Sequence, residues 1–162
     1  MTEPARLHLA LLVALLVSSC GGSPSAAPGA SSPSASPAAS ATTPGCNLVP
    51  GSLVTAQLGI AVGNPKVTSN PLVTTCAYAV GANPSGVLIR FQIHENHASF
   101  VDGKSKFNTT TDVSSVGDEA YYSVLASYTA LVARKGTVEI EITSKASLTA
   151  ERRLMLMLLA EV

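Results

Sequence analysis

The chain has 162 residues, with ten lysines and arginines against ten aspartates and glutamates, so its formal net charge is zero. Charged residues make up only 12% of the chain, whereas about a quarter is usual for a globular protein. The balanced charge argues against the basic surface that nucleic-acid binding requires, and it provides no polybasic signal for membrane attachment.

An apolar run near the N-terminus predicts a secretory leader. It covers residues 7–17, follows Arg6 and is interrupted only by His8. Its length is about half that of a helix that crosses a bilayer, which fits the core of a signal peptide. We therefore interpret residues 1–19 as a signal peptide.

The leader ends in Val17-Ser18-Ser19-Cys20, and two glycines follow. A small apolar residue, two small residues and a cysteine resemble the lipobox of bacterial lipoproteins. The resemblance implies that Cys20 receives a diacylglyceryl group and becomes the new, often acylated, amino terminus after cleavage. Two or three acyl chains, at about 0.8 kcal/mol per buried CH₂, anchor a protein stably where one chain does not. An ordinary secretory signal with a stray cysteine is the alternative.

Residues 21–45 consist only of glycine, serine, proline, alanine and threonine. Such a segment cannot bury enough apolar surface to offset the entropy of ordering it. We interpret residues 20–45 as a lipidated cysteine and a disordered tether, with a random-coil span of about 25–30 Å. Its hydroxyl groups can carry O-linked sugars, and an unmodified spacer is the simpler alternative. The remaining residues 46–162 form a single predicted domain.

Two cysteines remain if Cys20 is lipidated: Cys46 and Cys76. In an exported domain they allow one disulfide, which would tie the start of the domain to its first strand. The chain-entropy relation gives roughly 3.5–4 kcal/mol of stabilisation for such a loop. Two free thiols or a metal-binding pair are the alternatives, and the lack of a Cys-x-x-Cys motif argues against redox catalysis.

The first half of the predicted domain indicates a helix, a loop and a hairpin. Pro50 and Gly59 suit the start and end of a short helix, and the Gly and Asn-Pro signals in residues 60–74 predict a loop. Residues 75–80 and 87–94 predict two strands around a turn. The second strand alternates between an apolar face and a more polar one. The apolar face holds Val87, Ile89, Phe91 and Ile93, and the other holds Leu88, Arg90, Gln92 and His94.

The second half predicts a helix at residues 97–107, three strands and a final helix. The strands cover residues 119–125, 129–134 and 137–143, and Ser147 suits the N-cap of the last helix. Hairpin-linked strands with one apolar face each predict antiparallel pairing. We therefore predict an α+β fold, with a twisted antiparallel sheet of about five strands and all helices packed on one face.

Several short motifs follow the lipobox and the tether. They are Cys46-Asn47-Leu48-Val49-Pro50, Cys76-Ala77-Tyr78, Val116-Gly117-Asp118-Glu119-Ala120-Tyr121-Tyr122 and a late Val-Glu-Ile-Glu-Ile strand. Together they resemble the small cell-envelope lipoproteins of actinobacteria, which include families of unassigned function. The resemblance covers nearly the whole chain. It implies a fold and a location at the outer side of the cell membrane, and it brings no cofactor and no catalytic residue.

His94 and His97 flank Glu95 and invite a metal-binding interpretation. The zinc-protease pattern needs histidines at i and i+4 on a helix, whereas the spacing here is i and i+3. A third ligand would have to come from elsewhere. We favour a polar junction between a strand and a helix, and we predict no metal site.

Asp118 and Glu119 form a carboxylate pair that suits general acid–base chemistry or a cation. Adjacent residues that enter a strand point to opposite faces, so a turn that displays both acids to water is the favoured interpretation. The sequence has no Gly-x-Ser-x-Gly, phosphate-binding loop or dinucleotide motif. We predict no catalytic residue and no cofactor.

Two surfaces are candidates for binding. The outward face of the sheet is either a partner-binding face or a solvated one. The last helix is apolar all round, so Leu156 and Met157 either pack under the first helix, which we favour, or contact a partner or lipid. The outward face carries Arg90, Gln92, His94, Glu139 and Glu141.

These observations predict a lipoprotein anchored outside the cytoplasmic membrane. It would be a non-enzymatic binding or accessory module of the cell envelope, with the membrane and an envelope protein or lipid as partners and no nucleic acid. One alternative is a carrier of a hydrophobic ligand in a cavity between the sheet and the last helix. Another is a small envelope hydrolase or protein inhibitor.

Overall fold

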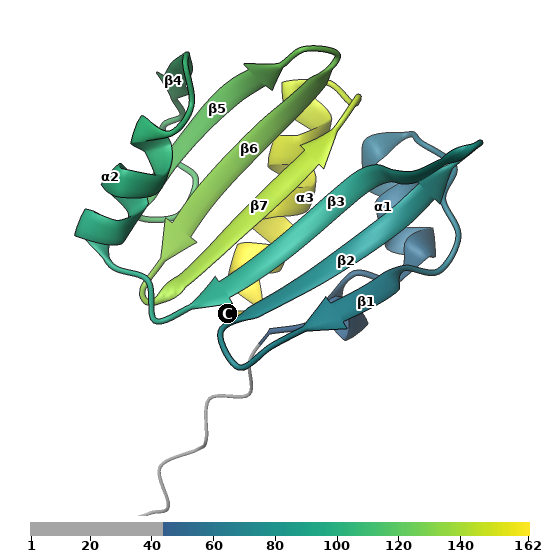
Figure 1. The fold of residues 1–162 in the computed structure, drawn as a ribbon, viewed down its shortest axis with the longest axis horizontal. Helices are drawn as coiled ribbons and strands as arrows, with labels where there is room; N and C mark the ends of the chain where they lie inside the picture. Colours follow the sequence, from purple (N-terminus) through teal and green to yellow (C-terminus); the bar gives the residue numbers. More distant parts are fainter. Residues whose placement is uncertain (1–43) are drawn as a thin grey trace, which may run out of the picture. The chain divides into compact units, whose positions relative to one another are not determined.

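A computed structural model describes residues 44–162. The predicted signal peptide, Cys20 and nearly all of the predicted tether lie outside these residues. The described part contains an antiparallel sheet of seven strands in the order β1-β2-β3-β7-β6-β5-β4 (Figure 1). The elements are η1 (Cys46–Leu48), α1 (Gly51–Leu58), β1 (Lys66–Ser69), β2 (Val73–Val80), β3 (Asn83–Ile93), α2 (His97–Ser105), β4 (Thr110–Asp112), β5 (Glu119–Leu125), β6 (Tyr128–Lys135), β7 (Val138–Ser144) and α3 (Leu148–Ala160).

The fold class is α+β, but the prediction of about five strands is wrong, because the sheet has seven. The two additional strands are its edges, β1 and β4. All four residues of β1 are exposed, and β4 is only three residues long. Neither strand has the apolar alternation that reveals a half-buried strand in a sequence, and short polar strands are common at sheet edges.

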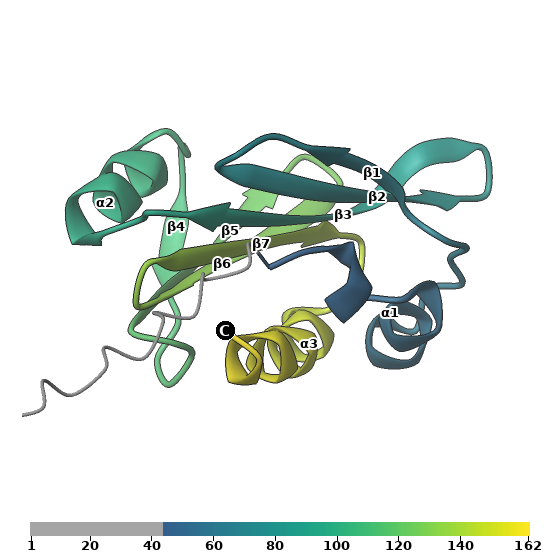
Figure 2. The same cartoon turned by 90° about the horizontal axis from the view of Figure 1, so that it is seen from below.

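The prediction that all helices pack on one face is also wrong. Figure 2 shows α1 and α3 on one side of the sheet and α2 on the other. We call these the inner face and the outer face. Phe100 of α2 packs with Tyr121 and Val132, whereas Leu131 and Ala133 belong to the main core. Because successive strand residues point to opposite faces, these contacts place α2 on the outer face.

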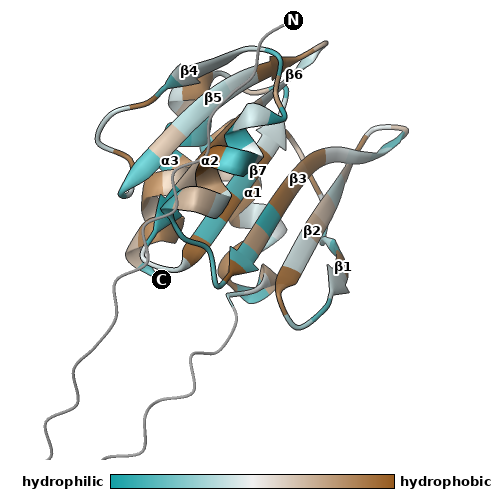
Figure 3. Cartoon of the chain, turned by 60° about the vertical axis from the view of Figure 1, so that its left-hand side comes forward, coloured by the Kyte–Doolittle hydropathy of each residue, from teal (hydrophilic) through white to brown (hydrophobic). Residues whose placement is uncertain are grey.

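The inner face carries the main hydrophobic core. Val87, Ile89 and Phe91 of β3 are fully buried there, as the alternation predicts, and they lie in one cluster with Leu154 and Leu158 of α3. Figure 3 shows hydrophobic and hydrophilic residues alternating along β3. Complete burial of one such side chain stabilises the fold by about 1.5–3 kcal/mol.

The outward side of α3 differs from the expectation. Leu156 and Met157 are each 44% exposed, so the prediction that they pack under the first helix is wrong. A helix that covers one side of a sheet buries a stripe of residues, and these two residues lie outside that stripe. Among residues 44–162, no helix is long and apolar enough to span a membrane.

The start of the described chain is fastened to β2. Cys46 and Cys76 form a disulfide with a Cα–Cα distance of 5.7 Å. Beside it, the Tyr78 hydroxyl donates a hydrogen bond to the carbonyl oxygen of Val49. Burial raises the pKa of Tyr78 above its ordinary value, so this hydroxyl stays protonated and keeps its role as donor.

Candidate functional site

The outer face carries a cluster of charged side chains on its central strands. Arg90 of β3 donates a hydrogen bond from Nη2 to Oε1 of Glu139 at 3.1 Å. Its Nε lies 3.1 Å from Oε2 of Glu141. The strand register explains the cluster, because Arg90 lies opposite Glu141 and Gln92 lies opposite Glu139 in the β3–β7 pair.

Helix α2 forms one wall beside this cluster. The helix begins at a capping box, in which the Asn96 side chain accepts hydrogen bonds from the backbone of Ala98 and Ser99. Phe100 and Phe107 then pack on Tyr121 of β5, with ring centroids 5.2 and 5.5 Å away. The aromatic contacts therefore hold α2 against the outer face.

A cleft of about 450 Å³ lies between α2 and the outer face. We call it the α2 cleft. Asp102 and Lys106 on its helical side form an ion pair at 2.8 Å, which leaves three glutamates and one arginine among its charged residues. The cleft is lined by Arg90, Gln92, Glu95, Ser99, Asp102, Gly103, Lys106, Phe107, Tyr121, Glu139 and Glu141.

Glu139 is the most unusual group of the α2 cleft, because it is a carboxyl group with only 6% of its residue surface exposed. Burial raises its pKa to about 7, and the negative charges of Glu95 and Glu141 add to the rise. The positive charge of Arg90 acts in the opposite direction. Glu139 therefore exchanges its proton near neutral pH, where its charge depends on what lies in the cleft.

A second group of contacting charged side chains lies at the edge of the outer face. Nδ1 of His97 lies 2.6 Å from Oε2 of Glu119, and Arg134 donates from Nε to Oε1 of Glu119 at 2.8 Å. Burial acts to raise the pKa of Glu119, but its hydrogen bonds to Arg134 and His97 outweigh that effect and lower the pKa. The imidazole is thus oriented by a carboxylate that a guanidinium holds in place.

The structure separates the two predicted histidines. His97 joins Glu119, whereas His94 is exposed and lines a different pocket. Within residues 44–162, no group of three or more histidine, cysteine or acidic side chains is placed to hold a metal ion. In the same part of the chain, no serine, threonine or cysteine side chain hydrogen-bonds to His97.

The predicted carboxylates Asp118 and Glu119 have different hydrogen-bond partners, although Arg134 forms an ion pair with each of them. Asp118 accepts a hydrogen bond from the backbone of Gly136 at 2.7 Å and so fastens the turn between β6 and β7. Glu119 points to the outer face and pairs with Arg134. Arg134 was not predicted as a site residue. The register of the β5–β6 hairpin could have revealed it, since residues 119 and 134 lie directly opposite each other.

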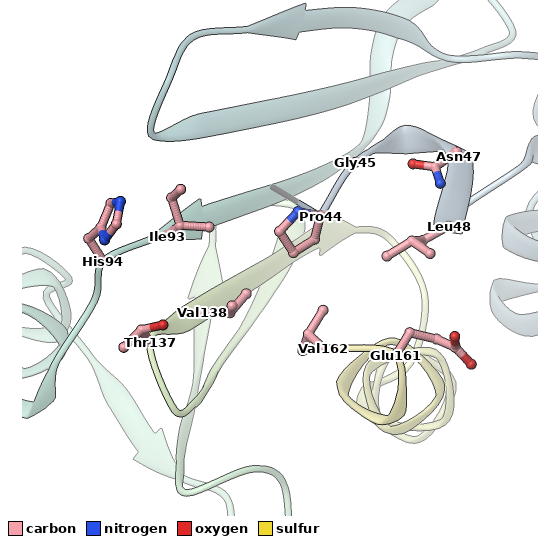
Figure 4. Close-up of a pocket in the computed structure, with 10 residues that line it drawn as sticks. All are labelled: Pro44, Gly45, Asn47, Leu48, Ile93, His94, Thr137, Val138, Glu161 and Val162. Atoms are coloured by element: carbon pink, nitrogen blue, oxygen red, sulfur yellow. The ribbon is translucent and has the colours of Figure 1, made fainter. Parts of the chain in front are cut away.

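A second pocket, of about 570 Å³, lies where the described chain begins, and we call it the entry pocket (Figure 4). It is bounded by η1, the end of β3, the start of β7 and the residues that follow α3. Most of its surface is apolar. It is lined by Pro44, Gly45, Asn47, Leu48, Ile93, His94, Thr137, Val138, Glu161 and Val162.

The inner face contains one buried acid that the sequence analysis did not identify. Glu151 of α3 is fully buried, and its Oε1 accepts hydrogen bonds from the hydroxyls of Ser144 at 2.6 Å and Thr129 at 2.7 Å. Its other carboxyl oxygen, Oε2, is buried without a hydrogen-bond partner in the described part. Burial raises the pKa of Glu151 to about 7, although the two hydroxyls act against the rise.

Comparisons with known proteins add little. No protein-family model matches the chain, and no curated protein is similar to it. The crystal structure of a GTP-binding regulator from Thermotoga maritima is similar at a TM-score of 0.47 and 7% identity, over 68% of this chain and 87% of that chain. A likeness this weak carries no inference about function.

Proposed function

We propose that the protein is a lipid-anchored, extracytoplasmic binding module of the cell envelope that performs no chemistry itself. The proposal is supported by the apolar leader, by the lipobox at Cys20 and by the uncharged composition of the segment that follows. The Cys46–Cys76 disulfide fits an oxidising compartment outside the cytoplasm.

The α2 cleft is the binding site in this proposal, and one observation carries it. Glu139 and Glu141 both pair with the guanidinium of Arg90, and a third carboxyl group, Glu95, lines the same cleft and acts on Glu139. The surplus of negative charge favours a ligand with a cationic group, such as a lysine side chain of an envelope protein. A cation near Glu139 would stabilise its ionised form and thereby gain affinity from a carboxylate that burial otherwise disfavours.

Anchoring is tested by replacing the lipidated residue. We expect the Cys20→Ala variant to move from the membrane fraction to the soluble extracytoplasmic fraction, because stable anchoring needs the acyl chains. A variant that stays in the membrane as firmly as the wild type would contradict the anchor.

Binding is tested by photo-crosslinking in intact cells. A photoreactive amino acid replaces Lys106, which lines the α2 cleft, or Lys66 on the exposed edge strand β1 as the matched control. We expect specific adducts from position 106 only, and their loss when Glu139→Gln and Glu141→Gln are added. Equal adducts at both positions, or adducts that survive the removal of both carboxylates, would overturn the assignment of the cleft.

A further inference from the structure

The entry pocket has walls suited to an alkyl chain. Leu48, Ile93, Val138 and Val162 are all partly buried around it. Its volume of about 570 Å³ falls in the usual range for small-molecule sites, roughly 300–1,000 Å³. The described residues that line the pocket include no phenylalanine, tyrosine or tryptophan, so beside the imidazole of His94 it offers mainly branched aliphatic surface.

The two ends of the entry pocket differ in charge. His94 lies at one end, beside Ile93, and Glu161 lies at the other, beside Val162 (Figure 4). The imidazole of His94 offers a hydrogen-bond donor to an anionic head group, whereas Glu161 brings a negative charge to the other end, near the Lys135 ammonium that donates to the carbonyl oxygen of Val162. The backbone of His94 has a φ of 65°, a left-handed conformation that is uncommon outside glycine and that recurs at ligand sites.

The pocket also lies at the point where the chain enters the domain. Pro44 and Gly45 form part of its wall, and Pro44 is 24 residues from Cys20. The tether predicted from the sequence has a random-coil span of about 25–30 Å. Under the proposed anchoring, the pocket is therefore held near the bilayer surface, where single-chain lipids concentrate.

We propose that the entry pocket binds a long-chain fatty acid, with the alkyl chain between Leu48, Ile93 and Val138 and the carboxylate at His94. The ligand is a separate molecule, because the protein's own acyl chains are needed together in the bilayer for stable anchoring. This site shares no lining residue with the α2 cleft. Binding itself does not depend on the function proposed for that cleft, and only the supply of ligand rests on the anchor.

A chain-length series tests the proposal on the Cys20→Ala chain that begins at residue 20, which lacks both the apolar leader and the acyl chains and can be handled without detergent. Dodecanoate, tetradecanoate and hexadecanoate displace a fluorescent fatty acid, cis-parinaric acid, below their micelle concentrations. We expect one site per chain and an affinity that rises up to about fourfold per added CH₂. Dodecanol, which has no negative charge, binds more weakly than dodecanoate. His94→Gly, which suits the φ of 65° and removes the imidazole donor, removes most of that difference.

A filling variant distinguishes the pocket from other apolar surfaces. Val162→Trp places a large ring in the pocket at a partly buried residue that packs against the edge of the main core, and it abolishes displacement. Val124→Trp, the same change at a residue that is 60% exposed on β5, leaves it intact. Circular dichroism and thermal unfolding verify that both variants fold. Binding that is unsaturable, independent of chain length or unchanged in Val162→Trp overturns the proposal.

A second experiment shows whether the alkyl chain in the pocket comes from a free fatty acid or from the protein's own anchor. Wild-type protein in phospholipid nanodiscs and the Cys20→Ala chain are each irradiated with a diazirine-labelled hexadecanoate. We expect both to be labelled on peptides that contain Ile93 or Val138. Labelling of the variant alone would mean that the anchor's own chain fills the pocket, which contradicts the proposal. If the proposed anchor is wrong, the fractionation of the Cys20→Ala variant shows it, whereas this labelling experiment does not.

Discussion

The two faces of the sheet each bury a glutamate with a pKa of about 7, but in opposite settings. On the inner face, Glu151 lies among aliphatic side chains and meets only hydroxyl groups. On the outer face, Glu139 is paired with Arg90 and crowded by two further acids. Within residues 44–162, only the hydroxyls of Ser144 and Thr129 oppose the desolvation of Glu151, so its neutral form is part of the packing. The pKa of Glu139 depends on opposing charges, so a charged ligand in the cleft can shift it.

The largest expected effect concerns packing on the inner face. Leu154→Ala removes a fully buried side chain of α3 and should lower the free energy of unfolding by about 2–5 kcal/mol, through lost burial and the cavity left behind. Leu156→Ala is the matched control on the same helix, where the leucine is 44% exposed. Its cost should be well under half as large in urea unfolding. Equal losses would mean that α3 does not bury the stripe described.

The next effect is the pH dependence of stability. Because the folded-state pKa of Glu151 is raised to about 7 from an ordinary value of 4.5, its contribution is fully present below pH 4.5. It is lost as the pH rises from 4.5 to 7, at up to about 1.4 kcal/mol per pH unit. Urea unfolding between pH 4 and 8 measures this loss. Glu139 is raised over the same interval, so Glu151→Gln, which stays neutral, should remove only the share of Glu151 from the slope. An unchanged slope would contradict the assignment.

A smaller effect separates the outer face from the inner one. Arg90→Gln removes the cation that opposes the desolvation of Glu139. The pKa of Glu139 should therefore rise above about 7, whereas that of Glu151 should stay where it is. The chemical shifts of the two carboxyl carbons, followed by NMR across the titration, measure both values. A parallel rise at both glutamates would show that the variant perturbs the whole sheet.

The smallest expected effect is at the edge of the outer face. The side chain of His97 is 75% exposed although it contacts Glu119, and exposed ion pairs contribute only about 0–1 kcal/mol. His97→Gln should therefore change the free energy of unfolding by less than about 1 kcal/mol. A larger loss would mean that the His97–Glu119–Arg134 chain holds α2 in place, a role we assign to the aromatic contacts.

Local signals in the sequence predicted the central elements of the fold. Gly59 ends α1 with a φ of 70°, and Ser147 caps α3, because cap residues act through neighbouring backbone groups alone. The alternation along β3 predicted its buried face for the same reason. The edge strands were missed because pairing with a neighbour, and no local pattern, makes residues 66–69 a strand.

The candidate site was predicted only in part. Arg90, Glu139 and Glu141 were placed together on one face, since strand periodicity determines the face. The cleft above them was not predicted, because it depends on the side of the sheet on which α2 packs. That choice comes from the contact of Phe100 with Tyr121, residues 21 positions apart in the sequence. The burial of Glu139 follows from the same contact and was equally hidden.

The response of Glu139 to a bound cation tests the central claim most directly. The carboxyl carbons of Glu139 and Glu151 are titrated by NMR with and without a saturating lysine-containing peptide. We expect the peptide to lower the pKa of Glu139 from about 7 and to leave that of Glu151 unchanged. If neither pKa moves, or if both move alike, Glu139 does not respond to the peptide differently from the core residue Glu151. The α2 cleft is then not a binding site for cations.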